Sequence, residues 1–194
     1  MSTKTYSLKK NGNIKLSNNF KVKEFACKDG SDTILISSEL VALLQEIRDH
    51  FGKPVTINSA YRNATYNKKI GGATYSQHVQ GTAADIVVKG VSPLEVAQYA
   101  EYLMPKIGGI GLYPSFTHVD VRGNRSRWQN YGTEKVVNGF PGYEEELTVD
   151  KAVDILVESG IIAEPAKWKT STAWSKENVS CLIIKTAKHL RGLQ

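Results

Sequence analysis

The spacing of apolar residues predicts two helices in the first half of the chain. In SSELVALLQEIRDHFG, apolar side chains recur every three or four positions, with Ser37 or Ser38 as the N-cap and Gly52 directly after the end. In SPLEVAQYAEYLMP, Ser92 and Glu95 form a capping box, and a proline occupies the first helical position. Both segments therefore have the start signals of a helix as well as its apolar face.

Shorter apolar runs around these helices predict strands. In KPVTINSAYR, Val55 and Ile57 alternate with polar neighbours, and SQHVQGTAADIVV turns at Gly81 before an apolar run. GGIGLYP and FTHVDVR have the length of two further strands, joined by a Pro-Ser turn. Helices packed on a small antiparallel sheet give an α+β fold.

The pattern changes in the last third of the chain. Residues 126–147 are rich in Gly, Asn and charge, which is typical of a linker or an irregular loop. Beyond them, LTVDKAVDILVESGII and KENVSCLIIKTAKHL each have apolar residues at helical spacing. We therefore divide the chain into a first domain over 1–125, a connection over 126–147 and a small all-helical module over 148–194.

Composition and charge narrow the function classes. The 194 residues are 41% hydrophobic and 23% charged, as in a globular protein, and no apolar run has the roughly 20 residues of a transmembrane segment. The N-terminus is polar and has no apolar signal-peptide core, so we expect synthesis in the cytoplasm without this signal.

The net charge of +6 is concentrated in the first part of the chain. Residues 1–142 have 18 basic and 11 acidic side chains, whereas residues 143–194 have 7 and 8. A basic surface favours polyanions, either nucleic acid or an anionic bacterial wall. The chain has no RNP-type aromatic motif, zinc finger or arginine-rich run, so we expect no nucleic-acid partner.

Two short motifs place histidine near aspartate. His78 and Asp85 lie on either side of a glycine turn, and in THVDVR the two-residue period of a strand puts His118, Asp120 and Arg122 on one face. Two histidines and a carboxylate match a zinc site with a fourth position open to water. The alternative is structural, with buried metal-free histidines and an Asp120–Arg122 ion pair. HExxH, the helical zinc-protease motif, is absent.

The same motifs resemble a known family. S-x-H-x-x-G-x-A-x-D, from Ser76 to Asp85, followed by H-x-D at 118–120 and preceded by S-x-Y-R at 59–62, is similar to the zinc D-Ala-D-Ala carboxypeptidases and L-alanyl-D-glutamate endopeptidases (LAS-type metallopeptidases). The resemblance covers roughly residues 15–125. It implies a hedgehog- and DD-peptidase-like fold around one Zn²⁺. The helical tail more weakly resembles wall-associated modules of clostridia and their phages.

The resemblance also implies roles for individual residues. His78, Asp85 and His118 would be the zinc ligands. Arg62 would contact the substrate or stabilise the developing oxyanion, and Ser76 would line the substrate cleft. These roles follow from the family motifs and not from spacing alone.

One position departs from the family pattern. Many members have E-x-x-H or H-x-H in the last strand, whereas this chain has His118-x-Asp120. We assign His118 as the ligand and Asp120 as the general base for the attacking water. The swapped assignment, with Asp120 as ligand and His118 as catalytic partner, stays open.

Together these features predict a zinc-dependent peptidoglycan peptidase, a carboxypeptidase or an endopeptidase that cuts the stem peptide or cross-link of the bacterial wall. Without a signal peptide, the expected setting is a phage or prophage endolysin that acts at the wall after release. Two alternatives from other classes remain. One is a non-catalytic zinc-containing wall-binding protein, and the other is a metal-free structural protein.

Overall fold

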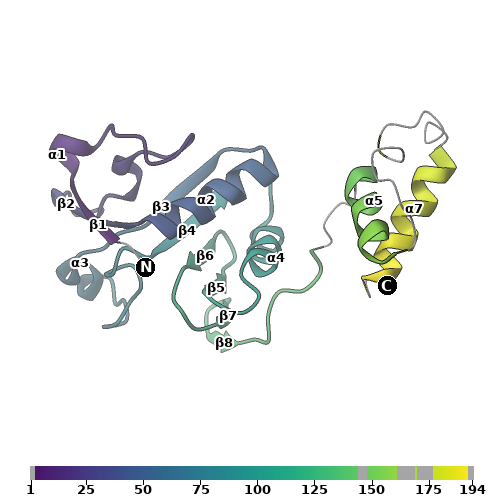
Figure 1. Ribbon diagram of the computed structural model, residues 1–194. Helices are drawn as coiled ribbons and strands as arrows, with labels where there is room; N and C mark the ends of the chain where they lie inside the picture. Colours follow the sequence, from purple (N-terminus) through teal and green to yellow (C-terminus); the bar gives the residue numbers. More distant parts are fainter. Residues whose placement is uncertain (1–2, 144–147, 161–168, 170–176, 192–194) are drawn as a thin grey trace. The chain divides into compact units, whose positions relative to one another are not determined.

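A computed structural model of the chain describes residues 3–143, 148–160, 169 and 177–191 (Figure 1). The chain divides into two compact units, Met1–Tyr143 and Glu144–Gln194. Among the described residues, no helix is both long enough and apolar enough to cross a bilayer.

The first unit contains helices and strands in mixed order. Its helices, including one 3₁₀ helix (η1), are α1 (Leu8–Asn11), η1 (Val22–Phe25), α2 (Ser38–Phe51), α3 (Ala64–Lys69) and α4 (Pro93–Leu103). Its strands are β1 (Thr3–Ser7), β2 (Thr33–Ser37), β3 (Val55–Ser59), β4 (Ala83–Val88), β5 (Gly109–Leu112), β6 (Thr117–Asp120), β7 (Ser126–Asn130) and β8 (Glu134–Val136). This composition confirms the predicted α+β class.

The strands form two sheets. β1 and β2 pair antiparallel, and the other six strands follow the order β3-β4-β6-β5-β7-β8. Neighbours in the larger sheet run antiparallel except β5 and β7, which are parallel. The predicted small antiparallel sheet is therefore larger than expected and mixed.

The two long helices start and end where their sequence signals predict. The hydroxyl of Ser37 accepts the amide of Leu40 at the start of α2, and the helix ends at Gly52 in the left-handed region with φ 58°. In α4, Ser92 and Glu95 form both bonds of the capping box.

Alternation along the central strands separates a core face from a polar face. Ala84, Ile86 and Val119 point into the hydrophobic core together with buried residues of α2 and α4. Because side chains alternate along a strand, Asp85 and His118 project from the opposite face. The polar residues of β4 and β6 thus lie together on a rigid, buried sheet.

The expected linker over 126–147 is different in the structure. Ser126–Asn130 and Glu134–Val136 form two strands that extend the sheet beyond β5. The fully buried Arg127 side chain pairs with Glu101 and donates to the carbonyl of Gly108, so its charge is satisfied inside the fold. The polar composition of this segment suggested a loop. The residues that satisfy Arg127 are far away in the sequence, so its burial could not be recognised from the segment itself.

The second unit is described by two helices, α5 (Val149–Glu158) and α7 (Glu177–Leu190). The Thr148 hydroxyl caps α5 by accepting the amide of Lys151. The two helices pack through a small cluster of buried side chains from their predicted apolar faces, Ala152, Leu156, Ile183 and Ala187.

Candidate metal centre

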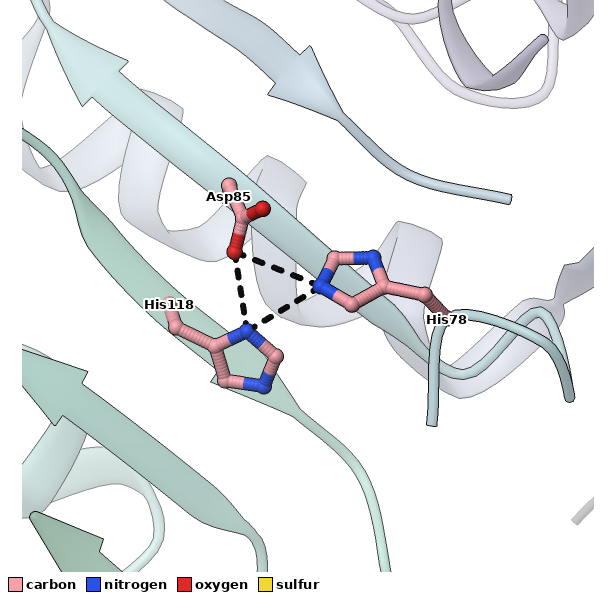
Figure 2. Close-up of side chains that lie close together, drawn as sticks. All are labelled: His78, Asp85 and His118. Atoms are coloured by element: carbon pink, nitrogen blue, oxygen red, sulfur yellow. Dashed lines mark hydrogen bonds and ion pairs between the residues drawn. The ribbon is translucent and has the colours of Figure 1, made fainter. Parts of the chain in front are cut away.

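One row of residues crosses the large sheet and contains the polar centre. The strand register pairs Asp85 on β4 with His118 on β6, His118 with Gly111 on β5, and Gly111 with Trp128 on β7. His78 joins this row from the turn before β4, as Figure 2 shows. The sheet therefore fixes two of the three side chains and a short turn supplies the third.

Three ligand atoms converge at this point. The His78 Nε2 lies 3.3 Å from Asp85 Oδ1, the His118 Nδ1 lies 2.9 Å from the same oxygen, and the two nitrogens are 3.3 Å apart. Tetrahedral ligands at about 2.0–2.1 Å from Zn²⁺ are separated by about 3.3 Å. The donor set and its spacing therefore fit a zinc ion, and all three residues are buried.

The other nitrogen of each imidazole has a fixed partner. His78 Nδ1 lies 2.7 Å from the carbonyl of Ala60 and donates to it, since a carbonyl can only accept. His118 Nε2 lies 3.1 Å from Asp120 Oδ2 and donates to that carboxylate. Hydrogen bonds of this kind fix the tautomer of a metal-binding histidine. Both lone pairs consequently point toward the shared centre.

Asp120 is held beside the centre by a set of hydrogen bonds. Its side chain is fully buried and accepts five hydrogen bonds, from the Gly109 amide, the Arg122 amide, Arg122 Nε and Nη2, and His118 Nε2. A Cβ on Gly109 would lie 2.1 Å from Asp120 Oδ2, so glycine leaves the space for this carboxylate. Asp120 is absent from the cavity wall, and both of its oxygens are engaged. The assignment of Asp120 as a general base and the swapped assignment of Asp120 as a ligand both stay predictions.

Arg62 and Ser76 both line the cavity. Arg62 Nη2 donates to Asp85 Oδ2 at 2.6 Å, and its Nε donates to the Ser59 hydroxyl at 2.8 Å. The oxygen of Asp85 that faces away from the histidines is thus held by a cation. The Ser76 hydroxyl accepts the amide of His78 at 3.3 Å and supports the turn that bears this histidine.

The electrostatics of the metal-free centre follow from burial and these contacts. Burial by itself would raise the pKa of Asp85, but its contacts with His118 and His78 lower it well below its usual range. Burial opposes the charged form of His118, yet its hydrogen bonds with Asp120 and Asp85 raise its pKa to about 9. Burial lowers the pKa of His78. His118 is therefore the ligand that must lose a proton before zinc can bind.

The centre opens into a cavity of about 460 Å³. Two cations, Arg62 and Arg122, line it with the carboxylate of Glu134. The remaining wall includes four aromatic residues, Tyr75, Tyr113, Phe116 and Trp128. A space of this size suits a short peptide.

The aromatic part of this wall was not predicted from the sequence. Tyr113 and Phe116 lie at the two ends of the turn between β5 and β6, and their rings stack with centroids 4.3 Å apart. Trp128 lies in the segment that was expected to be a linker. A Cβ on Gly111 would lie 2.4 Å from the indole of Trp128, so the glycines of GGIGLYP were the available signal for a bulky group beside β5.

Comparisons with known proteins agree with this geometry. The model of the peptidase M15 family matches residues 17–120. A zinc D-Ala-D-Ala carboxypeptidase of Streptomyces albus G is 36% identical over 88 residues, which are 44% of this chain and 34% of that protein. The chain thus covers about a third of the length of this relative. β7 and β8 lie beyond the matched family residues.

Proposed function

The chain belongs to the peptidase M15 family, and we propose that it is a zinc-dependent peptidase that hydrolyses a peptide bond in the stem peptide or cross-link of bacterial peptidoglycan. The observation that carries this proposal is the convergence of His78 Nε2, Asp85 Oδ1 and His118 Nδ1 with both tautomers fixed. The name of the relative from Streptomyces albus G supports the zinc and a peptide that ends in D-Ala-D-Ala.

His78, Asp85 and His118 would hold the metal. A bound zinc ion supplies a Lewis acid that polarises the scissile carbonyl and lowers the pKa of water. Arg62 pairs with Asp85 and presents its guanidinium to the cavity, where it can pair with substrate oxygen atoms. Asp120 acts as a positioning residue that keeps the proton of His118 on Nε2.

The charged groups of the cavity suit a peptide with a free carboxylate. Arg62 and Arg122 are separate cations on its wall, and Arg122 is held by Asp120 and lies over Trp128, 5.8 Å from the ring centroid. A carboxypeptidase needs a cation near the scissile bond, and the name of the relative supports D-Ala-D-Ala termini as the first substrate to test. An endopeptidase would accept the same peptide without its free carboxylate.

The cellular setting is part of the proposal. The excess of basic residues over 1–142 favours attraction to the anionic wall. A separate helical unit follows the catalytic one, an arrangement compatible with a phage or prophage endolysin that is released to the wall. Turbidity loss of intact cells after external addition, compared with permeabilised cells, tests this setting.

The function itself is tested with three peptides and zinc-loaded protein. A stem peptide ending in D-Ala-D-Ala, its C-terminal amide and a cross-linked dimer are incubated with the full chain, and mass spectrometry identifies the products. Loss of one alanine from the free acid but not from the amide supports a carboxypeptidase. An internal cut in all three supports an endopeptidase.

The buried position of Asp120 favours a second candidate, a zinc-containing protein that binds the wall without cutting it. Apart from Asp85, Glu134 is the carboxylate among the described residues of the cavity wall, so few groups are available to accept a proton. One zinc per chain, binding to purified wall and no product from any peptide would support this candidate over the peptidase.

A further inference from the structure

The hydroxyl of Tyr113 is attached to the metal centre through a short series of contacts. Tyr113 follows β5 and lines the same cavity as the three candidate ligands. Trp128 Nε1 donates to its hydroxyl oxygen at 3.1 Å, and the Trp128 ring lies 5.0 Å from the His118 ring. The Tyr113 ring stacks on Phe116 at an interplanar angle of 12°. Both ends of the tyrosine are therefore held in place.

Because Trp128 donates its hydrogen bond to Tyr113, the hydroxyl hydrogen of Tyr113 is still available to donate. A phenol has one hydrogen to donate and can also accept. Trp128 can only donate, so it occupies the acceptor side of Tyr113. Within residues 3–143, no acceptor is found for the Tyr113 hydrogen. Burial raises the pKa of Tyr113, which keeps the hydroxyl protonated at neutral pH.

The sheet order places this donor across the centre from Arg62. Arg62 follows β3, Tyr113 follows β5, and the strands that bear Asp85 and His118 lie between them. A peptide carbonyl at the centre would thus have a cation on the β3 side and a neutral hydroxyl on the β5 side. Fixed donors aimed at a developing oxyanion are a major source of rate enhancement in acyl transfer.

We propose that the Tyr113 hydroxyl donates a hydrogen bond to the scissile carbonyl oxygen as it becomes an oxyanion, and that Trp128 positions this hydroxyl. The inference rests on the proposed peptidase function and adds a substrate-contacting residue to it. No covalent bond to Tyr113 is formed, and its proton stays on the phenol oxygen throughout. Trp128 lies on β7, which is outside the residues matched by the family model.

The test compares Tyr113→Phe with Trp128→Phe and the double variant, using the zinc-loaded full chain. Tyr113→Phe removes only the hydroxyl and keeps the ring on Phe116. Tyr131→Phe is the matched control, because Tyr131 is 61% exposed and lies outside the cavity wall. Zinc content is measured for every variant. Hydrolysis of a cell-wall peptide and calorimetric binding of a phosphinate analogue of that peptide are the two readouts.

For Tyr113→Phe we expect kcat to fall about 100-fold, as for removal of other oxyanion donors. KM should stay within about threefold, since the bond strengthens only in the transition state. Phosphinate affinity should fall in parallel, with zinc content unchanged. Trp128→Phe should cause a smaller loss, and the double variant should be no worse than Tyr113→Phe because the tryptophan acts through the tyrosine.

Unchanged kcat and phosphinate affinity in Tyr113→Phe, or a change in KM alone, would overturn this inference while wild-type hydrolysis upholds the peptidase. A wild-type protein that binds zinc and hydrolyses no peptide would instead overturn the proposed function, and the role of Tyr113 with it. The two failures are distinguished by the wild-type reaction.

Discussion

Replacing Asp120 with asparagine distinguishes a positioning role from that of a general base. The carboxylate accepts three hydrogen bonds on Oδ1, from Gly109 and twice from Arg122, and two on Oδ2, from Arg122 and His118. The amide nitrogen of asparagine can only donate. The amide nitrogen would therefore take the place of Oδ2, because only two donors face that position whereas three face Oδ1.

This substitution has consequences for both the metal and the fold. With an amide N–H facing it, His118 Nε2 must accept, so the ring proton moves to Nδ1 on the metal side. Loss of such outer partners typically lowers metal affinity about 10- to 100-fold. Arg122 also loses its buried counter-ion, and breaking a buried pair costs about 3–5 kcal/mol, reduced here because the Arg122 side chain is 26% exposed.

The assay is zinc affinity by chelator competition, with unfolding of the metal-free protein in denaturant as the check on folding. Below pH 9, protons compete with zinc for His118. Asp120→Asn lowers the pKa of His118 and so weakens this competition, which would hide a loss of zinc affinity. The affinities are therefore compared near pH 9, where protons compete little in either protein. Asp150→Asn, an exposed position in the second unit, is the control. Wild-type zinc affinity together with lost hydrolysis in Asp120→Asn would refute the positioning argument and restore Asp120 as the base.

Three further outcomes are expected. Gly111→Ala should lower the free energy of unfolding by about 1–3 kcal/mol, because the added methyl group meets Trp128, whereas Gly123→Ala, which meets nothing within 4 Å, should change it little; denaturant titration measures both. The pKa of about 9 for His118 in the metal-free fold lies above the ordinary 6.5, so its charge stabilises that fold fully below pH 6.5 and this contribution is lost as the pH rises through 9. Zinc must displace this proton, so its apparent affinity should rise about tenfold per pH unit from 6.5 to 9, and a pH-independent affinity would contradict the assignment. Glu134→Gln should leave zinc content unchanged and lower kcat if this carboxylate accepts the proton of water, and unchanged kcat would exclude that role.

Local signals in the sequence were sufficient to predict the two long helices, and short motifs pointed to the candidate metal ligands. The capping residues of α2 and α4 act within one turn of the chain, so they can be recognised without tertiary information. Spacing alone left His78, Asp85 and His118 open between a metal site and a structural role, and the resemblance to the family motifs favoured the metal site. The structure brings all three together. Their individual roles remain predictions until metal binding is measured.

The features that sequence reasoning missed depend on distant partners. Asp120 resembles a catalytic carboxylate in H-x-D, but the motif does not show that Gly109 and Arg122 donate hydrogen bonds to it in the fold. The strand that bears Trp128 contains the buried Arg127, whose charge is satisfied by Glu101 on α4 and by the carbonyl of Gly108 after that helix. Neither arrangement follows from residue type or spacing.

Above all, we propose that His78, Asp85 and His118 hold the zinc ion on which hydrolysis depends. The direct measurement is zinc per chain by elemental analysis in wild type, His78→Ala and a His50→Gln control, with peptide hydrolysis followed in the same samples. His50 stacks on Tyr99 and lies outside the cavity wall. We predict about one zinc and active hydrolysis in wild type and control, with both lost in His78→Ala. Retention of zinc by His78→Ala, or no zinc in wild type supplied with the metal, would contradict the account.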